Sequence, residues 1–259
     1  MKKQVKIVFI ILIPVLSLAI VAGAIAFHAS KDVIEGCFIR KMYGSIGIAN
    51  EDDYAMTMVL FSFNSDASFL DDKENIAFDN SNVEIVDLSY KVQNVDGDLT
   101  VYDVLVTIKM KKVGRHDVTS LVYNGEEKEV FPIGEIHFFY QDTASDFLLH
   151  GCNTNIYNGE AVFQFSAENT RGFTITDVIV ADDERSKYTY EKNVHFTPGE
   201  ELTYIINVNS SENDHNLLVL QPIFEIQYDG SEEKQYFSPY MLVFSGSNMT
   251  YDEIKEYVK

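Results

Sequence analysis

The feature that most constrains this chain is an alternation of apolar and polar residues with a period of two. It is clear in residues 99–110, where Tyr102, Val104, Val106, Ile108 and Met110 occupy every second position and Asp103, Thr107 and Lys109 lie between them. A half-buried β-strand requires this alternation, because successive side chains leave opposite faces of the sheet. The chain also has 15 Tyr and 18 Phe, whose rings pack well on a pleated surface. The sequence therefore predicts an all-β fold.

The same period predicts a series of short strands separated by turns. They are expected at residues 54–63, 83–92, 99–110, 120–123 and 129–140, and, after a polar joint at 141–159, again at 161–167, 173–181, 188–195, 202–209, 218–228 and 235–244. The intervening segments are rich in Asn, Asp, Gly and Ser, as turns require. A short helix is expected in residues 249–259, because Thr250 and Glu253 have the spacing of a capping box.

Two stretches are nearly the same: YNGEEKEVF, from Tyr123 to Phe131, and YDGSEEKQYF, from Tyr228 to Phe237. Asn-Gly and Asp-Gly tolerate positive φ and are typical of the turn of a β-hairpin. The copies are offset by 105 residues at the Tyr and 106 at the Phe. These similar offsets favour duplication of a unit of about 100 residues; the alternative is chance similarity between two acidic hairpins.

A unit of about 100 residues with short strands and frequent turns fits a β-sandwich of the immunoglobulin type. In this pattern, over residues 54–245, the chain resembles the tandem immunoglobulin-like modules of bacterial envelope proteins. It departs from the antibody type, because it has no Trp and therefore no Cys…Trp…Cys framework. The resemblance implies a first β-sandwich in residues 54–142 and a second in residues 143–259, the latter with the short C-terminal helix.

The N-terminus carries a second constraint, an uncharged run of 21 residues from Ile7 to Phe27 that follows Lys2, Lys3 and Lys6. As a helix this run would be about 30 Å long, enough to cross a bilayer. Residues 1–29 are therefore interpreted as a single-pass membrane anchor. The alternative is a cleaved signal peptide, since residues 24–26 read Ala-Ile-Ala. Either interpretation leaves the N-terminus in the cytoplasm and exports the rest of the chain.

Residues 30–53 are expected to form a juxtamembrane stalk or helix. The apolar residues Val33, Ile34, Cys37, Phe38 and Met42 have helical spacing.

The charge of the chain limits its partners. It has 40 acidic and 20 basic residues, a formal net charge of −20. Such a surface repels phosphate backbones, so nucleic-acid binding is excluded as a function. Two interpretations of the acidic surface remain: a soluble exterior that resists nonspecific contact, or a site for a cationic ligand.

No catalytic group is predicted. No His has the spacing of a zinc motif, and neither a nucleophile elbow nor a phosphate-binding glycine loop occurs. Asp96 and Asp98 are candidate calcium ligands, although a hairpin turn explains the same residues. Cys37 and Cys152 are the only cysteines and could form one disulfide; the alternative is two free thiols. No cofactor is expected.

One aromatic group is a candidate contact surface. It consists of Tyr236, Phe237 and Tyr240, since neighbouring residues of a strand point to opposite faces and some of these rings would be exposed.

These observations predict a membrane-anchored, extracytoplasmic protein that is not an enzyme and works by binding, with another envelope or membrane protein as its partner. A second hypothesis is an accessory subunit of a membrane transporter or export complex, whose acidic domains cover a passage for a cationic cargo. A third is an enzyme built on a β-sandwich scaffold, since a fold alone does not exclude catalysis.

Overall fold

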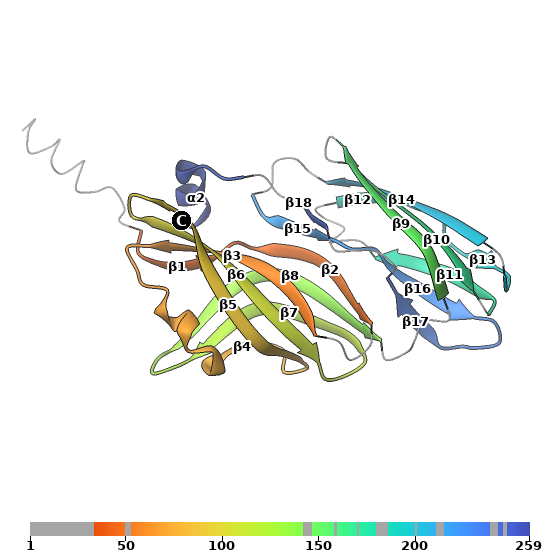
Figure 1. Ribbon diagram of the computed structural model, residues 1–259, viewed down its shortest axis with the longest axis horizontal. Helices are drawn as coiled ribbons and strands as arrows, with labels where there is room; N and C mark the ends of the chain where they lie inside the picture. The colour runs from red at the N-terminus through yellow and green to blue at the C-terminus, as the bar shows by residue number, and fades with distance from the viewer. Residues whose placement is uncertain are drawn as a thin grey trace, which may run out of the picture. The chain divides into compact units, whose positions relative to one another are not determined.

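The computed structural model describes residues 34–49, 53–141, 147–157, 160–169, 171–179, 186–199, 201–210, 215–238, 243–245 and 248–259. Over this part the chain is almost entirely β, as predicted, and Gly36–Lys259 forms one compact unit (Figure 1). The predicted membrane segment from Ile7 to Phe27 lies outside the described residues. Within them, no helix has both the length and the apolar character needed to cross a bilayer.

The first sheet has the order β1-β3-β6-β5, with all neighbours antiparallel. Its strands are β1 (Gly36–Ile39), β3 (Tyr54–Phe63), β6 (Leu99–Met110) and β5 (Val83–Asp96). The predicted bounds of β3 and β6 are confirmed. In both strands core residues recur at every second position, such as Met56, Met58 and Leu60 of β3. Strand β5 continues four residues past its predicted end at 92, through a β-bulge between Val92 and Asn94.

The second sheet has six strands in the order β18-β15-β2-β8-β7-β4. They are β18 (Val243–Ser245), β15 (Leu217–Leu220), β2 (Met42–Ala49), β8 (Lys128–Gln141), β7 (Gly114–Asn124) and β4 (Ile76–Phe78). Strand β2 runs parallel to both of its neighbours, β15 and β8. This sheet therefore joins strands from the beginning, the middle and the end of the chain.

These two sheets share one hydrophobic core. Met58 of β3 and Val106 of β6 pack in the same buried cluster as Ile46 of β2 and Phe138 of β8. Val219 of β15 is fully buried in this cluster as well. The short 3₁₀ helices η1 (Ser68–Asp71) and η2 (Lys73–Asn75) connect β3 to β4.

The prediction of a helix or stalk over residues 30–53 is wrong for residues 36–49, which form β1 and β2. Gly36 and Gly44 have φ of 119° and 147°, a backbone that a helix does not adopt. Glycine also lowers helix propensity. Met42, Ile46 and Ile48 instead occupy alternate positions of β2 and face the core.

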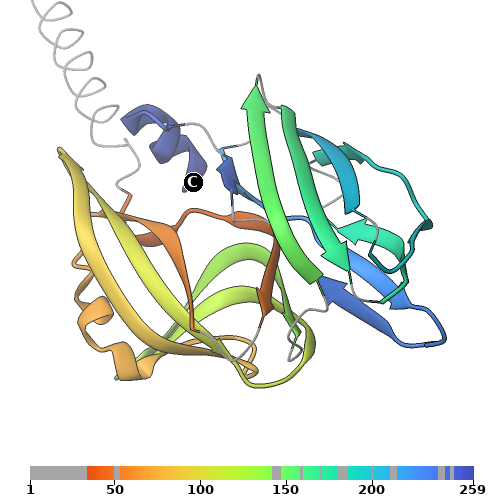
Figure 2. The same cartoon turned by 45° about the vertical axis from the view of Figure 1, so that its right-hand side comes forward.

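The remaining strands form two four-stranded sheets (Figure 2). One has the order β12-β14-β10-β9 and consists of β12 (Ser186–Thr189), β14 (Glu201–Ser210), β10 (Glu160–Asn169) and β9 (Phe147–Tyr157). The other has the order β13-β11-β16-β17 and consists of β13 (Val194–Phe196), β11 (Phe173–Ile179), β16 (Ile223–Tyr228) and β17 (Lys234–Phe237).

Both repeated stretches form hairpins, as predicted. The stretch from Tyr123 to Phe131 joins β7 to β8, and the stretch from Tyr228 to Phe237 joins β16 to β17. Three predicted strands are each divided in two. The strand at 218–228 breaks before Pro222, which has no N–H for a ladder, so β15 and β16 enter different sheets. The strand at 188–195 breaks at Asn193, whose φ is 57°. The strand at 235–244 divides into β17 and β18.

Candidate functional site

The C-terminal helix α2 (Tyr251–Tyr257) is the element around which a candidate binding site is built. Its predicted capping box is confirmed: the Thr250 backbone N–H donates to Glu253 Oε2 at 2.6 Å, and Thr250 Oγ1 accepts from the Glu253 N–H at 3.4 Å. Seven residues are too few for a helix that is stable by itself. The helix therefore depends on the surface against which it packs.

That surface is the outer face of the β1-β3-β6-β5 sheet. Ile254 is buried, and the rings of Tyr251 and Tyr257 contact Phe63 and Phe61, with centroids 6.5 Å and 6.3 Å apart. Phe61 and Phe63 alternate with the core residues of β3, so the helix covers apolar side chains that would otherwise face water. Figure 2 shows α2 next to the turn between β5 and β6.

Polar contacts hold both ends of the helix. Asp98, in the β5–β6 turn, accepts a hydrogen bond from the Tyr251 hydroxyl and pairs with Lys255 at 3.6 Å. The bond from Tyr251 and the charge of Lys255 lower the pKa of Asp98. At the other end, the Tyr257 hydroxyl accepts from the Lys41 backbone N–H at 2.7 Å and donates to Asn216 Oδ1 at 2.9 Å. The helix thus connects β3, the β5–β6 turn, the segment between β1 and β2 and the segment before β15.

A cavity of about 410 Å³ lies beside the helix, on the same face of the sheet. Its apolar walls come from Val59, Phe61, Leu99 and Val101 on the strands, and from Met249, Tyr251 and Ile254 on the helix and the residue before its cap. Ligand pockets in proteins are commonly about 300–1,000 Å³. The cavity is therefore large enough for a side chain or a small molecule.

Polar groups occupy the rest of the lining. Arg40 is only 7% exposed and donates through Nε to the His215 carbonyl at 2.6 Å, while Gln93, Asn94 and Asp96 of β5 and Asn248 supply amides and a carboxylate. Apolar walls with a few fixed polar groups are typical of sites that bind by shape and orient a ligand by hydrogen bonds.

The predicted calcium ligands have other roles in the structure. Asp98 holds helix α2 and Asp96 lines the cavity. Gly97 between them has φ of 61°, as a tight hairpin turn requires. Among the described residues, neither carboxylate belongs to a group of three or more His, Cys, Asp or Glu side chains close enough to share a metal ion.

The predicted aromatic surface is only partly accessible. Phe237 is 8% exposed and packs against Phe224, so its ring is not one of the exposed rings that this group was expected to include. Tyr236 is half-buried, with its ring centroid 4.9 Å from that of Phe139. The two residues point to opposite faces of β17, as the alternation implies, but each face is covered. Tyr240 lies outside the described residues.

Two alternatives were open for the cysteines, one disulfide or two free thiols. Cys37 is a free thiol in the structure. Its Sγ lies 3.6 Å from Ser62 Oγ, and burial raises the pKa of the thiol. The backbone of Cys152 pairs with Phe165 between β9 and β10, and its side chain lies outside the described residues.

The sequence did not reveal Arg40 or Asn248 as members of a site, because they approach the cavity from opposite ends of the chain. The sequence carried one signal for the helix of this site. A capping box precedes a short helix with Tyr251, Ile254 and Tyr257 on one side, and this pattern predicts a helix that packs on the protein rather than a frayed end. The strand on which it docks could not be read from that pattern.

No protein-family model and no curated protein matches the chain. Solved structures with some likeness include a protein of unknown function from Porphyromonas gingivalis W83, with 10% identity, a TM-score of 0.29, and coverage of 78% of this chain and 97% of that one. The secreted serine protease VesC from Vibrio cholerae has 10% identity, a TM-score of 0.22, and coverage of 78% and 52%. The C-terminal domain of the AgI/II polypeptide BspA from Streptococcus agalactiae has 7% identity, a TM-score of 0.20, and coverage of 82% and 100%. Likeness at this level carries no argument about the fold or the function.

Proposed function

We propose that this chain is a membrane-anchored, extracytoplasmic binding protein without enzymatic activity, built from two tandem immunoglobulin-like β-sandwich domains. The uncharged run from Ile7 to Phe27, preceded by lysines, supports the anchor and the export of the remaining chain. The observation that carries the binding role is the cavity beside α2, with its apolar walls and polar rim.

The strand orders support the immunoglobulin-like interpretation. An immunoglobulin constant-type domain has the strands A-B-E-D in one sheet and C-F-G in the other. In the first half, β1-β3-β6-β5 has the order expected for A-B-E-D, and β4-β7-β8 the order expected for C-F-G. In the second half, β9-β10-β14-β12 and β11-β16-β17 repeat both orders. Strand β1 pairs with β3, and β2 pairs with β8. These pairings favour a first domain that begins at Gly36 rather than at residue 54.

The partner that best fits the cavity is an extended peptide segment of another envelope or membrane protein. Three lining residues, Gln93, Asn94 and Asp96, belong to β5, which is the last strand of its sheet and is exposed over its final eight residues. The outer edge of such a strand offers N–H and C=O groups to an added strand. A peptide paired with this edge would place one side chain in the cavity.

Crosslinking in living cells, followed by mass spectrometry, tests this proposal with two matched variants of the full chain. Val59→Trp fills the cavity from its half-buried wall. Leu105→Trp adds the same ring on the same outer face, at a position that is 44% exposed and outside the cavity. We expect one recurrent partner with the unmodified chain and with Leu105→Trp, and its loss with Val59→Trp. An unchanged set of partners in Val59→Trp would refute the binding role of the cavity.

A second function, an accessory subunit of a transporter or export complex, is favoured by one sequence observation. The N-terminal run contains small residues that would permit close contact with neighbouring helices, namely Ala19, Ala22, Gly23, Ala24 and Ala26. Replacing residues 7–27 by an unrelated membrane-spanning sequence distinguishes the two functions. A binding protein keeps its partner after this exchange, whereas a subunit held by its helix loses its complex.

A further inference from the structure

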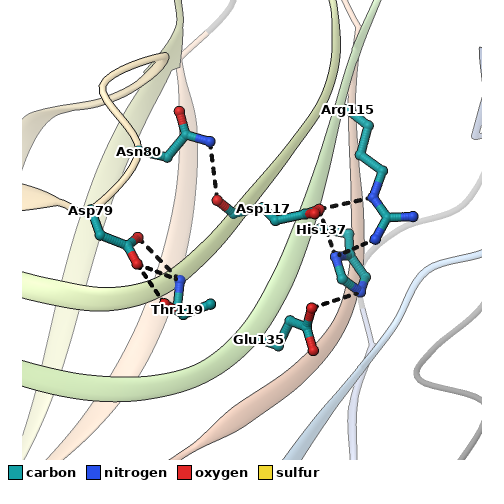
Figure 3. A network of polar contacts seen from close by, with 7 residues as sticks. All are labelled: Asp79, Asn80, Arg115, Asp117, Thr119, Glu135 and His137. Atoms are coloured by element: carbon teal, nitrogen blue, oxygen red, sulfur yellow. Dashed lines mark hydrogen bonds and ion pairs between the residues drawn. The ribbon is translucent and has the colours of Figure 1, made fainter.

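A second group of polar side chains lies on the outer face of β7 and β8, away from the cavity. Figure 3 shows Arg115 and Asp117 of β7 beside Glu135 and His137 of β8. Asp117 is opposite His137 in the antiparallel register, and Glu135 and His137 are two residues apart on one face. Asp117, Glu135 and His137 each offer one ligand atom, and these atoms lie within 4.8 Å of one another.

The contacts of His137 decide which ring nitrogen carries the hydrogen. Its Nδ1 is 2.7 Å from Asp117 Oδ1. An ionised carboxylate only accepts hydrogen bonds, so Nδ1 must be the donor, and Nε2 of the neutral ring keeps a free electron pair. Arg115 Nη2 is 3.0 Å from the same Nδ1, a contact that is not a hydrogen bond in this tautomer, while Arg115 Nε donates to Asp117 Oδ1 at 2.8 Å.

Hydrogen bonds fix the position of the Asp117 carboxylate. Its Oδ1 lies 2.8 Å from Arg115 Nε and 2.7 Å from His137 Nδ1. Asn80 contacts the same strand, because its Nδ2 donates to the Asp117 carbonyl at 3.0 Å. Thr119, two residues after Asp117 on β7, donates a hydrogen bond from its hydroxyl to the Asp79 carboxylate (Figure 3). The imidazole is therefore oriented by a carboxylate on a well-connected strand.

The free electron pair of His137 Nε2 faces Glu135 Oε1 at 4.0 Å. In the neutral tautomer with hydrogen on Nδ1, both of these atoms carry free electron pairs, and no hydrogen lies between them. Two zinc–ligand bonds of about 2.0–2.1 Å at a tetrahedral angle would place such atoms roughly 3.4 Å apart. Because the Glu135 side chain is 47% exposed, it has room to rotate and close the difference.

An independent observation comes from Ser45 of β2. It is paired with His137 in the parallel register of β2 and β8, so both side chains leave the same face of the sheet. Ser45 is 0% exposed, yet its hydroxyl has no hydrogen-bond partner. A buried hydroxyl in this state is unfavourable, and a water held by a neighbouring cation would satisfy it.

We propose that this group is a binding site for a divalent transition-metal ion, with His137 Nε2 and the Glu135 carboxylate as protein ligands and water in the remaining positions. Asp117 orients the imidazole through Nδ1, as carboxylates commonly do behind a metal-ligating histidine. An imidazole together with a carboxylate suits Zn²⁺ among the abundant divalent ions. The sequence search missed this pair because a Glu-x-His spacing aligns side chains on a strand and not on a helix.

The row of Ser45, His137 and Asp117 across β2, β8 and β7 has the residue types of a catalytic triad, but its geometry excludes that role. A triad needs a serine hydroxyl that bonds to the histidine and is open to substrate. The Ser45 hydroxyl has no hydrogen bond to the histidine, and it is fully buried.

Zinc titration of the full-length chain in detergent micelles, in competition with a chromogenic chelator, tests the site. Glu135→Gln removes one ligand at an exposed position, and His137→Asn removes the other. His195→Asn is the matched control. His195 also lies near a carboxylate, with Nδ1 3.7 Å from Asp229 Oδ1, but among the described residues no second carboxylate joins them as a shared ligand group. We expect one Zn²⁺ per chain for the unmodified protein and the control, and binding at least about tenfold weaker for both ligand variants.

Asp117→Asn should also weaken zinc binding, by about 10–100-fold, because it disturbs the orientation of the imidazole. The proposal is overturned if Glu135→Gln binds zinc as the unmodified chain does, since the ion then lies elsewhere. It is equally overturned if the unmodified chain takes up no zinc at about 100 µM, a concentration well above the Kd of most protein zinc sites. Glu135 is exposed, so this variant remains informative even if His137→Asn fails to fold.

Discussion

Replacing Ile254 by Ala should release the C-terminal helix from the sheet on which it packs. Ile254 is 5% exposed and is the buried residue of α2, whereas Asp252 and Glu256 on the same helix face water. Other contacts of the helix include two aromatic pairs, the hydrogen bonds of Tyr251 and Tyr257 and the ion pair of Lys255 with Asp98. Ile254 is therefore the main aliphatic contact that holds the helix in place.

The expected loss of stability follows from the atoms removed. Ile→Ala deletes three carbons, and each buried methylene contributes about 0.8 kcal/mol, which gives roughly 2–3 kcal/mol. Substitutions of this kind in protein cores cost about 2–5 kcal/mol when the cavity persists. The lower part of that range applies, because a seven-residue helix can shift to close the space. For a unit of this size we expect the melting temperature to fall by about 5–10 °C.

Thermal melting and hydrogen exchange of the full-length chain in detergent measure the two parts of this prediction. Exchange should rise in residues 251–257 and in the parts of β3 that the helix covers. Glu256→Ala is the control, because it changes an exposed residue to a good helix former and should leave both quantities unchanged. Equal melting temperatures for Ile254→Ala and Glu256→Ala would refute the packing argument, as would unchanged protection of the helix.

Two further predictions concern the cap of the helix and strand β3, on which the helix packs. Thr250→Ala removes the capping oxygen and should lower the free energy of unfolding by about 1 kcal/mol, whereas Thr250→Ser should keep most of it; urea unfolding measures both. Burial raises the pKa of Tyr54 from 10.0 to about 12. Because the folded-state pKa lies above the unfolded one, the folded protein retains the proton, and the associated stability is present below pH 10 and lost as the pH rises towards 12. Tyr54→Phe should therefore lose less stability over this pH window, and an equal loss in both proteins would contradict the argument.

The sequence predicted the β-strands best where apolar residues recur at every second position and both ends are marked by turn residues. Strands β3 and β6 meet these conditions, and their bounds were predicted without error. The repeated hairpins were predicted for the same reason, since Asn-Gly and Asp-Gly define the turns. Strands β1 and β2 were missed because two glycines interrupt the alternation, and the spacing that remains fits a helix equally well.

The candidate site was less accessible to sequence reasoning, because its residues come from distant segments. Arg40 and Asn248 are separated by most of the chain, and a local pattern carries no information on which strands become neighbours. Asp98 illustrates the same limit. Its place in an acidic turn suggested calcium, whereas its role is to accept a hydrogen bond from Tyr251, a residue 153 positions away. The capping box alone connected a local signal to a tertiary role, since an isolated helix of this length needs a surface to pack against.

The parallel pairing of β15 with β2 depends on a glycine and provides a last test of how the sheets are joined. Gly44 has φ of 147°, and a Cβ atom there would lie 2.1 Å from the Val219 carbonyl oxygen. Gly114 also has a positive φ, 116°, but a Cβ atom there would meet nothing within 4 Å. Gly114→Ala therefore carries only the backbone strain, about 1–3 kcal/mol, whereas Gly44→Ala carries the strain together with a clash against backbone.

Because a backbone carbonyl cannot rotate away as a side chain does, we expect Gly44→Ala to displace β15 and to break its three register pairs with β2. Its free energy of unfolding should fall by about 1–3 kcal/mol more than that of Gly114→Ala, the range expected for the lost hydrogen bonds. Hydrogen exchange should rise in residues 217–220 for Gly44→Ala alone. If both variants lose the same stability and residues 217–220 stay protected in both, the close approach of β2 and β15 does not hold the six-stranded sheet together, and other contacts, such as that of Tyr236 with Phe139, must join the two halves of the chain instead.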